Sequence, residues 1–320
     1  MIDGRRIVVV VPAYNEAGFI ETTLASVPEF VDAILVVDDA STDETSSIVR
    51  RMADPRIVLL SHETNQGVGR ALSTGYQRFL ESSTNDLDIC VVMAGDGQMD
   101  PRNLPALLRP LLLNLADYAK GNRLHSPSTL AEMPFVRRLG NRILTYATRL
   151  ATGDWNLGDS QCGYTAISGR GLRALDLHDL YPRYGYPNDL LIKLRRARVS
   201  IAEVPVRAVY GDEVSGIQPL RVVPRILLML ARGFLRRLRH EGPSESPSWA
   251  RSWYLAACAI WGLIAPITAL SVLVISVSAA LTAAVLGFLL LLGAFALFVG
   301  SLMEQTRSKP ATESVVPCES

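Results

Sequence analysis

Asp96 and Gln98 have the residue types and the spacing of a site for a metal ion and a diphosphate. They belong to the segment ICVVMAGDGQ, in which an apolar run typical of a strand ends on glycines and delivers one carboxylate and one amide. In open α/β sheets, ligands bind beyond such strand ends. Oxygen ligands of this kind suit Mg²⁺ or Mn²⁺ on a diphosphate, whereas a surface turn rich in Gly and Asp has the same composition. The neighbouring strand ends therefore decide between the two interpretations.

The first predicted strand ends in a segment that could hold a nucleobase. It reads VPAYNE and leads directly into a predicted helix. Pro12 and Tyr14 can form the walls of a base site, and Glu16 lies near the start of the helix. Taken alone, the Asn-Glu pair is more typical of helix capping.

The second and third predicted strands are also followed by polar or glycine-rich segments, VVDDAS and NQGVGR. Asp39 can accept a hydrogen bond from a base N–H or a ribose hydroxyl, as an acid does in dinucleotide folds, although a turn aspartate is the alternative. Gly67 opens a helix in the manner of a phosphate-binding loop. The third glycine of GxGxxG is absent, and the lack of any GxxxxGK[ST] motif excludes a P-loop.

Composition narrows the functional classes. The chain has 320 residues, enough for one large domain or two small ones, and a net charge of +1. Its four cysteines have no CxxC spacing and its four histidines are scattered, which argues against a zinc site or a disulfide framework and agrees with a reducing cytoplasm.

Short apolar runs alternate with helical patterns through much of the chain. This alternation predicts an α/β fold with a mainly parallel sheet and helices on both faces. Three polar strand ends in such a sheet are better evidence of a nucleotide site than any one alone. We expect strands at 7–11, 33–37, 57–60, 87–93, 163–167 and 200–206. We expect helices at 17–27, 67–80, 134–151 and 187–197. Two more helices are expected, one after a Ser41/Glu44 capping box and one after an Asp100 N-cap.

The ordered series VPAYNE, VVDDAS, NQGVGRA, AGDGQ and KGNRL resembles the family 2 glycosyltransferases of GT-A fold. Within that family the chain is most similar to dolichyl-phosphate and polyprenyl-phosphate sugar synthases. The resemblance covers about residues 5–210. It implies a GT-A nucleotide-diphospho-sugar transferase fold, a UDP- or GDP-sugar donor and a Mg²⁺ or Mn²⁺ cofactor.

The resemblance also implies a set of site residues, grouped by the part of the reaction that each serves. Nucleotide contacts are Pro12, Tyr14, Glu16, Asp39 and Gly67, metal ligands are Asp96 and Gln98, catalytic residues are Asp96, Arg123 and Asp159, and acceptor-phosphate ligands are Arg138 and Arg142. The two acceptor arginines stand four residues apart on one helix face, which is also the pattern of a solvated surface. Asp189 occupies the position of the base in relatives with hydroxyl acceptors.

One position departs from the family pattern. The family has Asp-x-Asp-x-Gln, and the first acid is replaced here by Ala94. This removes one carboxylate from the ribose or metal region. Two protein ligands, diphosphate oxygens and water still suit Mg²⁺, which keeps several waters in most sites.

The C-terminal third has the pattern of a membrane anchor. No charged residue occurs from Ser252 to Leu302, a length that suits two transmembrane helices, with a buried soluble hairpin as the alternative. We therefore expect a catalytic domain (1–217), a basic amphipathic helix on the anionic membrane surface (218–240), a linker (241–251), two spans (252–303) and a disordered tail (304–320). Because the N-terminus has no signal-peptide pattern, the catalytic domain is expected in the cytoplasm.

Together these features predict a membrane-anchored, inverting glycosyltransferase. It would move one sugar from a nucleotide diphosphate to a polyprenyl phosphate, such as a dolichyl or undecaprenyl phosphate. Two alternatives stay open: transfer to a hydroxyl of a glycan or glycolipid, with Asp189 or Asp159 as base, and a non-catalytic membrane protein that binds nucleotide sugars. The pattern gives no indication of nucleic-acid binding.

Overall fold

The computed structural model describes residues 1–125, 133, 135–207, 219–240 and 287 of the chain. The chain divides into two compact units, residues 1–237 and 238–320. The fold described below is that of the first unit.

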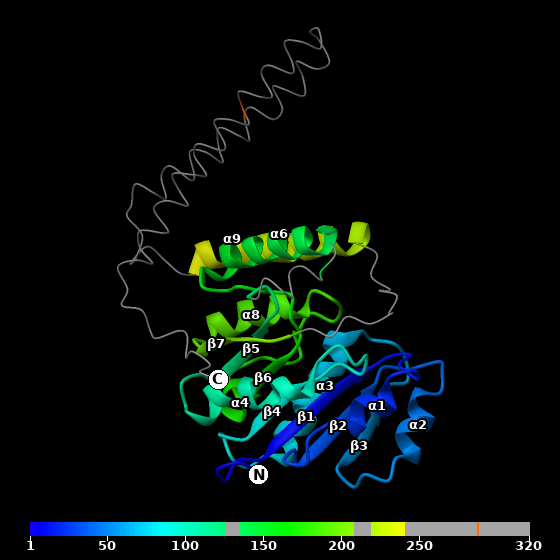
Figure 1. Cartoon of the computed structure of the whole chain (residues 1–320). Helices are drawn as coiled ribbons and strands as arrows, with labels where there is room; N and C mark the ends of the chain where they lie inside the picture. Colours follow the sequence, from blue (N-terminus) through cyan, green and yellow to red (C-terminus); the bar gives the residue numbers. More distant parts are fainter. Residues whose placement is uncertain (126–132, 134, 208–218, 241–286, 288–320) are drawn as a thin grey trace. The chain divides into compact units, whose positions relative to one another are not determined.

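A seven-stranded sheet forms the centre of this unit, in the order β3-β2-β1-β4-β6-β5-β7 (Figure 1). All neighbouring strands are parallel except at β6, which is antiparallel to both β4 and β5. The mainly parallel sheet expected from the sequence is thus confirmed. The strands are β1 (Ile7–Ala13), β2 (Ala33–Asp38), β3 (Ile57–Ser61), β4 (Ile89–Val92), β5 (Tyr118–Asn122), β6 (Thr165–Ser168) and β7 (Ile201–Pro205).

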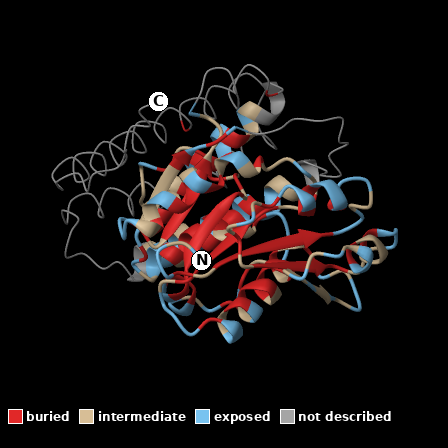
Figure 2. Ribbon diagram, turned by 60° about the horizontal axis from the view of Figure 1, so that its bottom comes forward, coloured by how far each residue is buried: buried red, intermediate tan, exposed pale blue. Residues whose placement is uncertain are grey.

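Helices cover the sheet on both faces, as predicted. Strands β1, β2, β4 and β6 are buried along their whole length, because a parallel sheet between two helical layers has no solvent-facing side (Figure 2). One hydrophobic core packs this sheet against α1 (Ile20–Ala25), α2 (Thr45–Arg51) and α4 (Leu104–Leu112). The other packs it against α3 (Val68–Ser82), α7 (Gly169–Arg173) and α8 (Tyr186–Arg196).

A third, smaller hydrophobic cluster joins α8 to two long helices, α6 (Phe135–Thr152) and α9 (Pro219–His240). Leu144 and Ala151 of α6 and Ile192 of α8 pack against Ile226 and Leu230 of α9. The Arg237 guanidinium also donates to the carbonyl of Leu150, at 3.0 Å. The basic helix expected around 221–240 is therefore present, and one side of it is packed on α6 and α8.

One local prediction is wrong and two elements were not predicted. The Ser41/Glu44 capping box is wrong: α2 begins after Glu44 without a side-chain cap, because the Ser41 hydroxyl instead donates to Asp38. Strand β5 and helix α7 were not predicted. The expected Asp100 cap is confirmed, since its carboxylate accepts from the Arg102 N–H at the start of a 3-10 turn, Pro101–Asn103.

Within the described residues, no helix is long and apolar enough to cross a membrane. The two spans expected at 252–303 lie outside those residues except for Gly287, as do the linker and the tail.

Candidate functional site

Polar side chains follow several strands at one edge of the sheet, where the parallel strands have their carboxyl ends. Strands β1, β2, β4, β5 and β7 all end at this edge, and antiparallel β6 begins there. A pocket lies at this edge between β4, β5, β6 and β7. It is lined by Asp96, Gln98, Met99, Arg123, Cys162, Gly163, Tyr164, Val206 and Arg207.

Asp96 and Gln98 lie on the turn that follows β4 and contribute to the same pocket. Gly97 between them has φ +73°, a left-handed conformation that favours glycine, and the Gln98 N–H donates to the Asp96 carboxylate at 3.0 Å. This tight turn brings the carboxylate and the amide of one short segment to the pocket. Among the described residues, no group of three or more His, Cys, Asp or Glu side chains could hold a metal ion. A divalent ion at Asp96 and Gln98 would therefore take the rest of its oxygen ligands from a bound ligand or from water.

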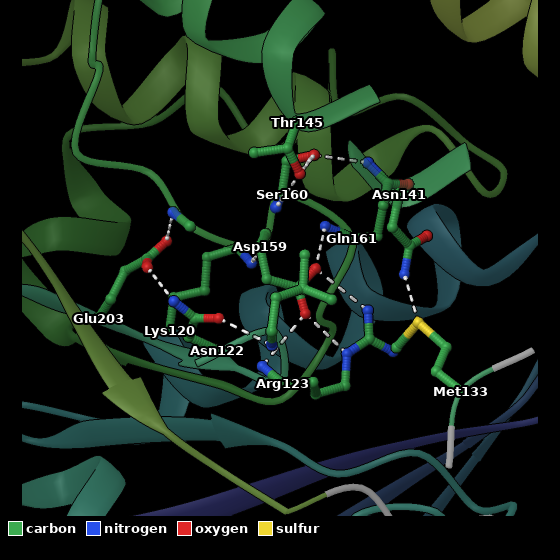
Figure 3. A network of polar contacts seen from close by, with 12 residues as sticks. Lys120, Asn122, Arg123, Met133, Asn141, Thr145, Asp159, Ser160, Gln161 and Glu203 are labelled. Atoms are coloured by element: carbon green, nitrogen blue, oxygen red, sulfur yellow. Dashed lines mark hydrogen bonds and ion pairs between the residues drawn. The ribbon is translucent and has the colours of Figure 1, made fainter. Parts of the chain in front are cut away.

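Arg123 follows β5 and is paired with Asp159, which lies in the loop that enters β6 (Figure 3). The guanidinium Nε lies 2.8 Å from Oδ2 of Asp159, and Nη2 lies 3.2 Å from Oδ1. Burial of the carboxylate opposes its ionisation, but the charges of Arg123 and Lys120 outweigh burial and hold the pKa of Asp159 at about 2. Asp159 is thus a permanent anion that fixes the arginine beside the pocket.

Two further charged residues, Lys120 and Glu203, hold the backbone around Asp159. Lys120 of β5 is fully buried and donates to the backbone carbonyl of Asp159, and it faces Glu203 in the register of β5 with β7. The Glu203 carboxylate accepts from the Gly158 N–H at 2.7 Å and from Asn122 Nδ2 at 2.8 Å (Figure 3). Burial raises the pKa of Glu203, although Lys120 opposes that shift. These contacts fix the backbone on both sides of Asp159.

At the end of β2, Asp39 is almost completely buried. Its carboxylate accepts from the backbone N–H groups of Gln66 and Gly67, at 2.9 and 2.7 Å, and lies 2.7 Å from His62 Nδ1. His62 Nε2 lies 2.9 Å from the Thr74 hydroxyl of α3. Asp39 therefore joins the ends of β2 and β3 to the start of α3.

The other residues expected to contact a nucleotide also lie at this edge, near the ends of β1 and β3. Pro12 is buried in β1, whereas Tyr14 is exposed and Glu16 is half-buried in the following turn. Gly67 precedes α3 with φ +94°, and a Cβ there would lie 2.5 Å from the carbonyl oxygen of Pro182. That position requires glycine for backbone and packing reasons.

Three predicted acceptor or base residues are not among the residues that line the pocket. Arg138 and Arg142 lie on α6, where Arg142 is exposed and Arg138 is half-buried. The Asp189 carboxylate, on the first turn of α8, accepts from Lys193 Nζ at 2.6 Å and from the Tyr181 N–H at 2.9 Å. Asp189 thus holds the loop before α8, and the structure does not bring it together with Asp96 and Arg123 in the pocket.

Sequence reasoning missed Arg207, Lys120 and Glu203. Arg207 lines the pocket two residues after β7, and its backbone carbonyl accepts from Asn103 Nδ2 at 3.2 Å. A basic residue directly after a predicted strand was the signal that could have identified it. Lys120 and Glu203 lie 83 residues apart in the chain, and only the pairing of β5 with β7 brings them together.

Comparison with known proteins connects this geometry to a family. The sequence model of the family described as Glycosyl transferase family 2 matches residues 8–175. A UDP-N-acetylglucosamine–dolichyl-phosphate N-acetylglucosaminyltransferase of Methanococcus voltae is 29% identical over 221 residues, which cover 64% of this chain and 86% of that protein. A dolichyl-phosphate beta-glucosyltransferase of Trichomonas vaginalis is 28% identical over 217 residues and 62% of each chain.

The fold is also similar to a solved enzyme structure. Glucosyl-3-phosphoglycerate synthase of Mycobacterium tuberculosis, crystallised with Mn²⁺, UDP-glucose and glycerol 3-phosphate, superposes with a TM-score of 0.54 at 25% identity. The match covers 76% of this chain and 83% of the other. The GT-A-type α/β fold expected for the catalytic domain is thereby confirmed.

Proposed function

The chain is a glycosyltransferase that belongs to glycosyl transferase family 2, and from this premise we propose that it transfers one sugar from a nucleotide diphosphate to a polyprenyl phosphate. Two relatives named for dolichyl-phosphate substrates support the choice of acceptor. The single observation that carries the proposal is the composition and position of helix α6. This helix bears Arg138 and Arg142, exposes apolar side chains, and is hydrogen-bonded to the loop of Asp159.

The donor would lie along the sheet edge from β2 to β4. Pro12, Tyr14, Glu16, Asp39 and Gly67 are proposed to contact the nucleotide, whose base is that of a UDP or GDP sugar. Asp39 is already held by two backbone N–H groups and His62, so it would offer its remaining acceptor capacity in a fixed direction.

Asp96 and Gln98 are the residues that would hold Mg²⁺ or Mn²⁺. One carboxylate and one amide oxygen fit such an ion when diphosphate oxygens and water complete its shell, as is usual for Mg²⁺. The related synthase crystallised with Mn²⁺ and UDP-glucose supports this assignment. When bound, the ion would stabilise negative charge on the departing diphosphate.

The proposed reaction is a single inverting displacement. An oxygen of the acceptor phosphate forms a bond to the anomeric carbon of the sugar, and the bond from that carbon to the diphosphate oxygen breaks with its electron pair. A phosphate monoester has a second pKa near 6, so the acceptor is anionic at neutral pH and needs no general base. Arg123, held by Asp159, would stabilise the negative charge that develops on the departing diphosphate. Arg207 lines the same pocket and would add to this positive charge.

We also propose that the outer surfaces of α6 and α9 lie on an anionic membrane. Large apolar side chains are exposed on both helices: Leu139, Ile143 and Tyr146 on α6, and Leu227, Leu228 and Leu235 on α9. Arg142, Arg225, Arg232 and Arg236 are exposed on the same helices. Arginines among exposed leucines suit the boundary between lipid headgroups and acyl chains. The uncharged stretch 252–303 would then anchor the chain as an integral membrane protein with its catalytic domain in the cytoplasm.

The test is transfer by the full-length protein in membranes, with a panel of UDP and GDP sugars, polyprenyl phosphate and either Mg²⁺ or EDTA. We expect one sugar per lipid phosphate and loss of activity on chelation. The Arg138→Ala/Arg142→Ala variant should lose lipid-phosphate transfer most strongly while it still binds the donor.

Three results would contradict the proposal. Full activity of the double arginine variant would remove the acceptor assignment, and transfer only to hydroxyl acceptors would favour the rival in which a carboxylate acts as base. Donor binding without transfer to any acceptor would favour the non-catalytic alternative.

A further inference from the structure

Helix α6 buries four polar side chains beside the apolar Leu144 and Ala151, and it exposes large apolar side chains on its other side, unlike an ordinary surface helix. Asn141, Thr145, Thr148 and Thr152 are all buried, at 9%, 4%, 0% and 3% exposure, and their spacing places them on one face. Leu139, Ile143 and Tyr146 on the other side are between 39% and 51% exposed. The inner face of α6 is therefore built to make hydrogen bonds as well as to pack.

The partners of this inner face are Ser160, which directly follows Asp159, and Asn188 on α8. The Ser160 N–H donates to the Thr145 hydroxyl at 3.1 Å, and the two hydroxyls lie 3.2 Å apart (Figure 3). Asn188 Nδ2 donates to the Thr148 hydroxyl at 2.7 Å and to that of Ser160 at 3.3 Å.

Gln161 extends this network toward the ion pair. Its side-chain amide donates to the Ser160 hydroxyl at 2.8 Å and to Asn188 Oδ1 at 3.1 Å, and its backbone N–H donates to the Asp159 carboxylate at 3.0 Å. Ser160 and Asn188 are fully buried. A buried network in which each member has partners fixes one relative position of the elements that it joins. Here it joins α6 and α8 to the loop that carries Asp159.

We propose that Thr145, Ser160 and Asn188 are positioning residues that hold α6 in register with the Asp159–Arg123 pair. Arg138 lies seven residues, two turns, before Thr145 on the same face of α6. An acceptor phosphate bound by the arginines of α6 would thereby be held at a fixed distance from the sugar beside Arg123. This inference rests on the proposed function, and it identifies residues that serve acceptor placement without contact with either substrate.

The chain offers a closely matched pair of substitutions. Thr145→Val removes the hydroxyl that binds Ser160, whereas Thr152→Val removes an equally buried hydroxyl whose bonds stay within α6 and the turn after it. Thr145→Ser keeps the hydroxyl and should restore most of what Thr145→Val loses. Each variant is prepared as the full-length protein in membranes, and its thermal stability is measured alongside.

Because small displacements of reacting groups reduce rates strongly, Thr145→Val should lower kcat/KM for polyprenyl phosphate about tenfold. Its Kd for UDP should stay within about twofold of the wild-type value, since the donor residues lie elsewhere at the sheet edge. Thr152→Val should lose a similar amount of stability, but it should change neither kcat/KM for polyprenyl phosphate nor the Kd for UDP. Equal kinetics of the two valine variants, or a parallel loss of UDP binding, would overturn the inference.

Hydrogen–deuterium exchange separates this inference from the proposed function. Thr145→Val should accelerate exchange at the amides of Ser160 and Gln161, and Thr152→Val should not. If wild-type protein transfers no sugar to lipid phosphate, the proposed function fails, and this exchange result still decides whether α6 positions the loop. Unchanged exchange at Ser160 in Thr145→Val would refute the positioning role.

Discussion

The guanidinium of Arg123 and the carboxylate of Asp159 form a two-point ion pair, with Nε 2.8 Å from Oδ2 and Nη2 3.2 Å from Oδ1. The carboxylate is fully buried and the arginine side chain is 12% exposed. Two parallel hydrogen bonds restrict both the position and the orientation of the planar guanidinium. Asp159 therefore acts on the pocket through Arg123, which itself lines it.

Asp159→Asn should be strongly destabilising and nearly inactive, because it leaves the largely buried guanidinium of Arg123 without its carboxylate partner. Removal of one partner of a buried pair typically costs about 3–5 kcal/mol. We expect kcat/KM to fall by about 100-fold in Asp159→Asn. In Arg123→Lys, which keeps the charge but not the two-point geometry, we expect kcat/KM to fall by about tenfold. Denaturant unfolding and initial rates measure both effects. Asp86→Asn is the control: it breaks an exposed pair with Arg173 and should cost less than about 1 kcal/mol.

Acid should destabilise the protein through Asp159. Its pKa is about 2 in the folded chain against 3.8 as the ordinary value, so the folded state favours the ionised form. The resulting stabilisation, about 2 kcal/mol, is fully present above pH 4 and is lost as the pH falls from about 4 to 2. Denaturant unfolding at several pH values should show this decline in the wild type and a shallower one in Asp159→Asn. If the free energy of unfolding fell equally with pH in both proteins, Asp159 would not be the source of the acid sensitivity.

The ends of β1, β2 and β4 could be predicted from the sequence because each of these buried strands is an apolar run that stops at polar residues or glycines. The run IVVVVPA of β1 and the glycines after β4 mark their own ends. Strand β5 could not be predicted in this way. It reads YAKGN, and lysine, glycine and asparagine are all disfavoured in strands. Its pairing with β6 and β7 decides its conformation, and with it the burial of Lys120.

The inverted polarity of α6 was hidden for a related reason. Its periodicity correctly predicts a helix, but the apolar stripe of Leu139, Ile143 and Tyr146 would ordinarily be assigned to the core. The hydrogen bonds to Ser160 and the packing of Leu144 and Ala151 on α8 and α9 show which face points inward. Periodicity determines the element, and tertiary contacts determine its orientation.

An acid in place of Ala94, which the resemblance to family 2 enzymes implies, should strengthen metal binding. Ala94→Asp would add a second carboxylate two residues before Asp96, and we expect the Kd for Mn²⁺ in the presence of UDP to fall by about tenfold. Asp96→Asn should raise that Kd at least tenfold. Isothermal titration calorimetry measures both.

Asp100→Asn is the matched control for the metal prediction. The Asp100 carboxylate caps a helical turn and pairs with the exposed Arg102; asparagine can still cap that turn, so the substitution should cost less than about 1 kcal/mol of folding stability and leave the Mn²⁺ affinity unchanged. An equal loss of metal binding in Asp96→Asn and Asp100→Asn would show that neither carboxylate is a specific ligand.

The outer face of α6 should contact lipid when the full-length protein is reconstituted in vesicles of anionic and neutral phospholipid. A fluorophore on Ile143→Cys, in a Cys258→Ser/Cys318→Ser background that leaves only the buried Cys90 and Cys162, should be quenched by brominated acyl chains. The same fluorophore on Leu115→Cys is the control, because Leu115 is comparably exposed but follows α4. We expect quenching at position 143 to exceed that at 115 at least threefold, because apolar side chains flanked by arginines enter the headgroup boundary. Equal quenching at the two positions would mean that α6 faces water, and the acceptor would then have to reach Arg138 and Arg142 by leaving the bilayer.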